Sequence, residues 1–558
     1  MSSELRMLLA IVLSFLVFFL YQVVFVKPPP TPTEQATGQK EVVQAQSGVA
    51  DEGVKPIEPV VEGASPLPGM PVTTPLREGR TITVSTPLYV AAFTENGAAP
   101  KSFKLREYRE ALPLDSPMQE LISLPDGYPS TLKVSFLGQG VAGLNEAVFD
   151  AETDRDSIEV PREGDRLTFT WTSPEGITIT RIYTFLPETY EIGHEIKVQN
   201  RSAQSIDKNL TISLMNALGD AANARYVFVG PTAFIDGELR EIKTDDIEEE
   251  GKQTGLIKWV SFQDRYFASA IVPQEARNAA MNIVMTPSGV VQTSYIDPSG
   301  PVPPGTERTY QYKVYLGPKR LKSLGVVGAD LTKIVDFGFF DMIAKPFLHM
   351  MNFLNRFIPN YGIVIIIITI IVKMLFWPLS NKSYQSMSQM KKLQPKMAEI
   401  RAKYKHDKKM MNQEIMNLYK LYKINPLGGC LPMVFQIPVF FAFYKMLYQA
   451  IELRHAPFFL WIDDLSAPDR LFDFGFTVPM MTPPYGIPVL TIIMGASMFF
   501  QQKMSPPPGD PTQAKMMMFM PIFFTFIFIN FPSGLVLYWL VNNILSMVQQ
   551  KYVTQKTG

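Results

Sequence analysis

The chain has 558 residues, and its 52 Lys and Arg residues balance 52 Asp and Glu residues, so net charge identifies no class of partner. One cysteine cannot form an internal disulfide, and four scattered histidines offer no zinc-binding pattern. A Walker A loop and a GxGxxG after a strand are both absent from the sequence. We therefore expect no metal site, no cofactor, no DNA partner and no small-molecule substrate.

The first predicted element is a membrane span within residues 1–26. Its run from Leu8 to Val26 is almost wholly apolar, close to the roughly 20 helical residues that cross a bilayer core. A cleaved signal peptide is the alternative, but Lys27 and three prolines follow the run without a small-x-small cleavage site. We predict an uncleaved signal anchor, followed at 27–79 by a flexible Pro-rich tether.

Residues 80–320 are predicted to form a large β domain. Leu167, Phe169 and Trp171 alternate with threonines, and after a Ser-Pro-Glu-Gly turn a second strand runs from Ile177 to Phe185. Many short strands with polar turns are typical of an antiparallel β-sandwich.

Residues 331–357 are predicted to form one amphipathic helix in the membrane interface. Ile334, Phe337, Ile343 and Phe347 recur at helical spacing, with charged residues between them. A helix packed on the soluble domain is the alternative, and we consider it weaker because a hydrophobic run follows directly.

Five further hydrophobic runs predict spans at 361–380, 431–448, 487–503, 516–531 and 533–550. With the N-terminal anchor this makes six spans. Two of the apolar stretches, 487–500 and 516–531, are shorter than the roughly 20 residues that cross a relaxed bilayer. We expect such spans to thin the bilayer locally or to take in flanking residues.

The loops predict the orientation of these spans. Residues 381–425 hold eleven Lys or Arg and three acidic residues, which places this loop in the cytoplasm by the positive-inside rule. The loop at 452–484 has two arginines and is predicted to be external. Counting back, the β domain is external and both termini are cytoplasmic.

The cytoplasmic loop is predicted to be a hairpin of two helices with basic outer faces. Such a hairpin could contact anionic lipid headgroups or ribosomal RNA, and a merely solvated hairpin is an equal alternative. Its candidate residues are Lys391, Lys392, Lys396, Arg401, Lys403, Lys405, Lys408 and Lys409.

Lys373 is the most informative residue, because a cation at bilayer depth costs about 2.5–3.5 kcal/mol. The alternative is a snorkelling lysine whose ammonium reaches the interface. We prefer an inward-facing functional lysine, with Thr369 one turn away on the same face. Other polar side chains could line a water-filled cavity together with Lys373. The alternative for each of them is a hydrogen bond that only holds two helices together. These side chains are Gln436 in the third span and Tyr538, Asn542 and Ser546 in the sixth.

Three stretches resemble signatures of the Oxa/Alb/YidC family of membrane protein insertases. They are Leu418–Pro432 with its Asn-Pro-Leu-Gly-Gly-Cys core, Phe500–Pro506, and Phe531–Trp539 with Phe-Pro-Ser-Gly. The resemblance implies a polytopic α-helical membrane protein with six spans. Five of them form a core around a hydrophilic groove that opens to the cytoplasm and to lipid, and a periplasmic antiparallel β-supersandwich is attached. The family usually has an arginine where this chain has Lys373, which keeps the charge and loses the planar fork of donors.

The resemblance also implies a function: insertion and folding of nascent membrane proteins in the bacterial inner membrane. The implied partners are nascent segments, the Sec translocon with its accessory subunits, the bilayer, and the ribosome or the signal-recognition pathway through the hairpin. The C-terminal tail is short and weakly basic, which speaks against ribosome docking through it. We expect client segments to slide past the third and fifth spans. The candidate residues for that path are Met433, Phe440, Met517 and Phe524.

No covalent chemistry is required, so we do not expect an enzyme. Two rival functions remain from other classes. One is a secondary transporter, although no internal repeat is evident. The other is an intramembrane Ser-Lys protease with Lys373 as base and a serine such as Ser533 as nucleophile.

Overall fold

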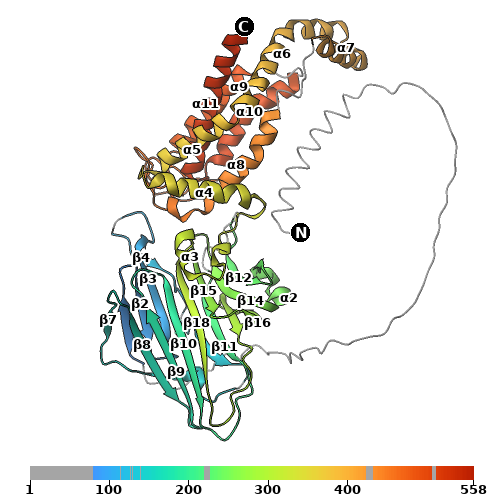
Figure 1. The fold of residues 1–558 in the computed structure, drawn as a ribbon. Helices are drawn as coiled ribbons and strands as arrows, with labels where there is room; N and C mark the ends of the chain where they lie inside the picture. The colour runs from blue at the N-terminus through green and yellow to red at the C-terminus, as the bar shows by residue number, and fades with distance from the viewer. Residues whose placement is uncertain are drawn as a thin grey trace, which may run out of the picture.

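The computed structural model describes residues 79–113, 115–125, 127–128, 130–138, 140–218, 227–422, 431–505 and 511–557. The predicted anchor at 1–26 and almost all of the predicted tether at 27–79 lie outside these residues. The described chain forms a β domain, residues 79–318, and a helical domain, residues 341–557, whose first helix α4 (Asp341–Asn355) lies on the side nearest the β domain (Figure 1).

The β domain is built from two sheets. The smaller sheet has five strands in the order β4-β3-β2-β1-β7, and the larger has thirteen, with β12 and β13 attached beside β14. The strands of the smaller sheet are β1 (Thr81–Ser85), β2 (Tyr89–Thr94), β3 (Ala99–Arg109), β4 (Met118–Glu120) and β7 (Ser157–Glu159). Those of the larger sheet are β5 (Lys133–Phe136), β6 (Asp150–Ala151), β8 (Asp165–Thr172), β9 (Ile177–Phe185), β10 (Glu191–Asn200), β11 (Leu210–Ala217), β12 (Gly230–Ile235), β13 (Glu238–Glu241), β14 (Lys252–Gln263), β15 (Phe267–Pro273), β16 (Arg277–Met285), β17 (Val290–Ile296) and β18 (Glu307–Pro318).

Alternation of apolar and polar residues explains why these segments form strands. Leu167 and Phe169 of β8 are buried while the threonines between them are half-exposed, and β9 occupies the predicted range with the same alternation. The two sheets therefore share one core, in which Phe93 of the smaller sheet packs edge-on against Tyr183 and Phe185 of the larger one. One pairing departs from the antiparallel prediction, because β1 and β7 run parallel.

Arg181 is an unusual member of this core, because its charged side chain is completely buried. Its guanidinium donates to the carbonyl oxygens of Gly97 and Leu132 and to the ring of His194 at 3.3 Å. Burial and the neighbouring Arg181 charge hold the pKa of His194 well below its usual value. The arginine thus fastens the loops of the smaller sheet to β9 of the larger one.

The helical domain contains α4 (Asp341–Asn355), α5 (Tyr361–Leu375), α6 (Trp377–Lys403), α7 (Lys408–Leu421), α8 (Leu431–Gln449), α9 (Val489–Met504), α10 (Pro511–Phe528) and α11 (Ser533–Thr557). Helices α5, α8, α9, α10 and α11 gather into a bundle, and α6 and α7 project from the end that is farther from the β domain (Figure 1). The short helix α3 (Leu321–Val327) follows β18.

The prediction of one helix over 331–357 is wrong. The segment consists of two 3-10 turns, η4 (Leu331–Ile334) and η5 (Gly338–Phe340), followed by α4. Carboxylates interrupt the helix, because Asp336 accepts from the Gly338 amide at 3.2 Å and Asp341 from the Phe337 amide at 3.3 Å. Gly338 also has a positive φ of 62°.

The predicted span at 361–380 is not one straight helix either. Helix α5 ends at Leu375, and α6 leaves it at an angle of 66° after Phe376. Pro378 in the first turn of α6 lacks the amide that would bond back to Met374, and its ring clashes with that carbonyl, which explains the bend. Helix α6 also continues from Trp377 without a break into the segment predicted to be the cytoplasmic hairpin.

In length and hydropathy, no single helix of the described residues meets the requirements for crossing a membrane. The bent pair α5 and α6 meets them together, and Met517–Phe528 is a shorter apolar helix.

Candidate functional site

A cluster of polar side chains lies between α5, α8 and α11, in surroundings that are otherwise apolar. We define this polar cluster as Lys373, Gln436, Tyr538, Asn542 and Ser546. Helical geometry explains its α11 half, because residues 538, 542 and 546 follow one another at intervals of four and so share one face.

Lys373 is the charged member of the polar cluster. Only 8% of it is exposed, and its ammonium donates to the Ser546 hydroxyl oxygen over 2.7 Å. Ser546 in turn donates to the backbone oxygen of Asn542 at 2.7 Å. The Ser546 hydroxyl therefore accepts a hydrogen bond from Lys373 and donates its own proton to a backbone carbonyl of α11.

The neutral members continue the network toward α8. The Gln436 amide nitrogen donates to the Asn542 side-chain oxygen at 2.9 Å. Tyr538 is buried one turn before Asn542, with its hydroxyl within hydrogen-bonding reach of Gln436. Five residues were predicted to line a groove with Lys373. Four of them, Gln436, Tyr538, Asn542 and Ser546, lie with Lys373 in the polar cluster. Thr369 does not join them, because its hydroxyl donates to the Ile365 carbonyl of its own helix at 2.7 Å.

Two residues of α6 that the sequence reasoning missed contact α11 near the polar cluster: Asn381 contacts Gln549, and Tyr384 contacts Ser546 of the cluster. Gln549, one turn after Ser546, donates to the Asn381 side chain at 2.9 Å and to the Trp377 carbonyl at 3.2 Å. The Tyr384 hydroxyl is hydrogen-bonded to Ser546. The sharp bend at Phe376 brings α6 back across α11, and its sequence signal, Pro378, was not used in the prediction.

No ion pair among the described residues involves Lys373. A buried ammonium with hydroxyl and helix neighbours alone is costly, because none of the described residues supplies an opposite charge to replace the lost hydration. Such a group is attractive to an incoming carboxylate.

An aromatic layer lies next to the polar cluster on its β-domain side. Trp539 of α11 stands edge-to-face on Phe440 of α8, with ring centroids 4.7 Å apart, and stacks on Phe524 of α10 at 6.4 Å. Trp539 was not predicted, yet it connects two of the four residues proposed for a client path. Met517 is exposed two turns before Phe524 on α10, and the side chain of Met433 lies outside the described residues.

The hairpin of α6 and α7 is held together by a small apolar core of its own. Leu393 and Met397 are buried against Ile415, Leu418 and Tyr419. Lys396 also contacts the Tyr422 hydroxyl and stands over its ring at 4.7 Å. The basic residues of the hairpin are mostly exposed. These are Lys391, Lys392, Lys396, Lys403, Lys405 and Lys409, with Arg401 half-buried and the side chain of Lys408 outside the described residues.

Ser533 lies far from Lys373. It opens α11, where its hydroxyl donates to the Asp464 carbonyl at 2.7 Å. Ser546, the contact of Lys373, follows thirteen residues later, or about 20 Å along a helix. Lys373 cannot serve as a base for Ser533 in this arrangement.

Comparison with known proteins covers both domains. Residues 81–350 match the family model described as YidC periplasmic domain, and residues 353–558 match that described as 60Kd inner membrane protein. A protein of Syntrophus aciditrophicus named membrane protein insertase YidC is 42% identical over 558 residues, covering 99% of each chain. One of the same name from Geobacter metallireducens is 40% identical over 554 residues, covering 99% of this chain and 98% of its own. A crystal structure titled active YidC insertase covers 85% of this chain and 92% of its own, with 16% identity and a TM-score of 0.36.

Proposed function

The chain belongs to the YidC family of membrane protein insertases of the inner membrane, and we propose that the polar cluster around Lys373 is where it handles its clients. The observation that carries the proposal is the buried ammonium of Lys373, hydrogen-bonded to Ser546 and lacking a carboxylate partner within the described residues. A nascent membrane-protein segment with an acidic residue near its translocated end would supply the missing negative charge.

The insertion step then needs three contributions. The α6–α7 hairpin receives the segment, the polar cluster holds its polar flank through Lys373, and the apolar part leaves into lipid past Phe440, Phe524 and Met517, with Met433 as a further candidate. Burial of an apolar span in lipid supplies the driving force at about 25 cal/mol per Å². No nucleotide and no covalent step is required, so we do not assign an enzymatic activity.

The proposal includes a topology. Six spans cross the membrane, with the anchor at 1–26 first, the β domain outside and both termini in the cytoplasm, as the distribution of Lys and Arg supports. The exposed lysines of the hairpin would then face anionic lipid and the ribosome or the signal-recognition pathway. The Sec translocon is proposed as a partner for larger clients.

Insertion into liposomes that contain this protein alone tests the proposal. The client is a small single-span protein with an acidic translocated tail, and protease protection of the tail is scored. We expect Lys373→Met to reduce protection by at least about tenfold, since it leaves the client carboxylate without its charge-assisted hydrogen bond. Lys373→Arg should retain most of the activity.

Two controls sharpen the result. Lys503→Met removes an exposed lysine at the end of α9 and should leave insertion unchanged. A client whose acidic residue is replaced by the neutral amide should lose its dependence on Lys373. If Lys373→Met inserted both clients as well as the original protein, the charge at residue 373 would have no role in insertion.

The hydrogen-bond directions also separate insertion from proteolysis. Because the Ser546 proton goes to the Asn542 carbonyl, the lysine does not activate this hydroxyl as a nucleophile. Ser546→Ala should therefore keep at least part of the insertion activity, with the client left uncleaved. Client cleavage that disappears in Ser546→Ala would contradict the insertase mechanism.

A further inference from the structure

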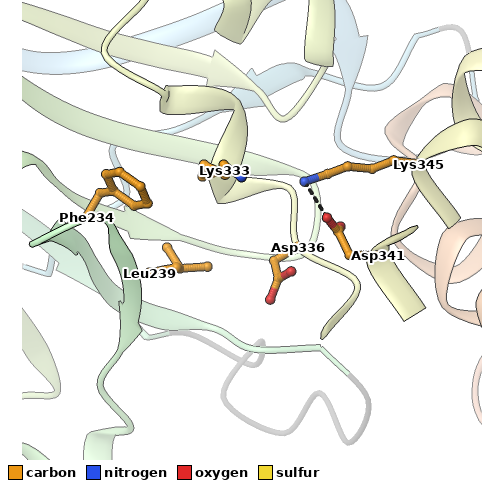
Figure 2. A pocket seen from close by; sticks show the side chains of 7 residues that line it. Phe234, Leu239, Lys333, Asp336, Asp341 and Lys345 are labelled. Carbon is orange, nitrogen blue, oxygen red and sulfur yellow. Dashed lines mark ion pairs between the residues drawn. The ribbon is translucent and has the colours of Figure 1, made fainter. Parts of the chain in front are cut away.

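A charged cavity lies where the β domain meets the start of α4, outside the polar cluster. Its volume is about 190 Å³, and Figure 2 shows its lining. The β12–β13 hairpin contributes one wall, with Phe234, Gly237 and Leu239. The segment from η4 to α4 contributes the other, with Lys333, Asp336, Asp341 and Lys345. The space is many times the roughly 10–15 Å³ that one ordered water needs.

The residues that line this cavity include two cations and two carboxylates, and Asp336 also interacts with Lys319 outside the lining. Lys345 pairs with Asp341 one turn earlier on α4, at 2.9 Å, while both side chains keep partial exposure. Backbone amides fix the two carboxylates, since Asp341 accepts from Phe337 and Asp336 from Gly338. Lys333 forms no ion pair within the described part of the chain, and its side chain is exposed. The cavity can therefore take a ligand that carries both signs of charge.

Two large, exposed apolar side chains are close in sequence to Asp341 of the cavity lining. Phe339 is 81% exposed and Met342 is 87% exposed, and they lie on either side of Phe340 and Asp341 in the chain. Phe340 itself is buried and stacks on Phe441 of α8, with centroids 5.8 Å apart. The start of α4 is thus tied to the bundle while its outer apolar residues lack protein cover. Beside a bundle in a bilayer, hydrocarbon chains provide that cover.

We propose that this cavity binds the headgroup of one phosphatidylethanolamine-type lipid from the outer leaflet. The phosphate lies between Lys333 and Lys345, and the primary ammonium donates to Asp336 and Asp341. The acyl chains run over Phe339 and Met342. The inference rests on the proposed topology, because it needs the β domain to be on the outer side of the membrane.

The charge pattern also predicts which headgroups are rejected. An anionic glycerol headgroup brings phosphate without an ammonium, so the two carboxylates oppose it. A choline headgroup has the right charges, but its quaternary ammonium has no N–H to donate and is bulkier. The cavity should accordingly bind an ethanolamine headgroup more tightly than a glycerol or choline headgroup. Only with ethanolamine can both the phosphate and the ammonium form charge-assisted hydrogen bonds with the lining residues.

Native mass spectrometry of the full chain measures this preference. The protein is purified in detergent, supplied with equal amounts of ethanolamine, glycerol and choline phospholipids of identical acyl chains, and the lipid retained per chain is counted. We expect one retained ethanolamine lipid, and at least about tenfold less retention in the double variant Lys333→Gln/Lys345→Gln. The exposed Lys322→Gln on α3 serves as the matched control and should retain the lipid.

Several outcomes would overturn the proposal. Equal retention of the glycerol lipid would mean that the site does not recognise the ammonium, and unchanged retention in the double variant would place the lipid elsewhere. Tight binding of water-soluble glycerophosphoethanolamine without acyl chains would assign the cavity to a free headgroup. Client insertion into liposomes that contain the ethanolamine lipid is scored in parallel. Retained lipid without client insertion would leave this site standing and refute the insertase mechanism at Lys373. Client insertion by a protein that retains no ethanolamine lipid would refute this site and leave that mechanism standing.

Discussion

Arg265 fastens the β domain to the helical domain, and its removal should loosen that joint. The residue lies in the turn between β14 and β15. Its guanidinium donates to the Tyr448 carbonyl at the end of α8 at 2.7 Å and to the Ser466 carbonyl at 3.3 Å. It also lies over the Tyr448 ring, 3.9 Å from its centroid.

The expected cost of Arg265→Ala follows from these contacts. Charge-assisted hydrogen bonds contribute about 1.5–3 kcal/mol each, and a cation–π contact contributes about 0.5–2 kcal/mol. Arg265 is half-buried, so water will replace part of what is lost. We therefore expect the opening free energy of the joint to fall by about 2–3 kcal/mol, which is roughly 30- to 150-fold in the population of the open joint.

Amide hydrogen exchange of the full chain in detergent measures that population. Peptides covering 262–268 and 446–454 should exchange roughly 30- to 150-fold faster in Arg265→Ala, while β9 and β10 should be unaffected. Arg265→Lys keeps the charge without the planar fork and should restore only part of the protection. Arg240→Ala removes an exposed arginine that pairs with Glu238 and should change nothing. Unchanged exchange in Arg265→Ala would refute this account of the joint.

Three further substitutions test other parts of the structure. Burial lowers the pKa of Lys319 to about 8 from 10.5. As the pH rises, the folded protein therefore loses this proton before the unfolded protein does, and the free energy of unfolding should increase between pH 8 and 10.5. Lys319→Met should remove that rise in Tm, and Lys322→Met should keep it. Asn360→Ala removes the side-chain cap of α5 and should cost about 1 kcal/mol in chemical unfolding; no change would mean that water caps the helix equally well. A Cβ at Gly495 would lie 2.0 Å from the Thr525 hydroxyl oxygen, so Gly495→Val should separate α9 from α10 and cost about 1–3 kcal/mol; an unchanged Tm would show that the helices adapt.

The sequence predicted the features that depend on local periodicity. Ile177–Phe185 is a strand because four of its five alternate positions are apolar, with Arg181 as the exception, and the pattern survives in the structure because one face of β9 is buried. Tyr538, Asn542 and Ser546 share a face because any helix places them there. Their meeting with Lys373 and Gln436 could be anticipated, since polar side chains among apolar ones seek one another.

Features that depend on backbone geometry were missed. Apolar residues at helical spacing predicted one helix over 331–357, although Asp336 and Gly338 provided a turn signal inside it. Pro378 likewise marked the bend after α5. The contacts of Tyr384 and Asn381 with α11 follow from that bend. Trp539 is different, because nothing local distinguishes a tryptophan that joins two helices from one that fills a core.

The polar cluster and the aromatic layer together make the helical domain asymmetric. Toward the β domain, Trp539 and its neighbours fill the space between α8 and α10, and Ser533 and Gly534 tie the start of α11 to the loop at 464–467. Away from the β domain, the hairpin is held by a core of its own that is separate from the main one. Because separate cores open independently at lower cost, the hairpin end is the end at which we propose that a client enters. In that proposal Lys373 holds the polar segment of the client until the apolar neighbour of that segment reaches lipid.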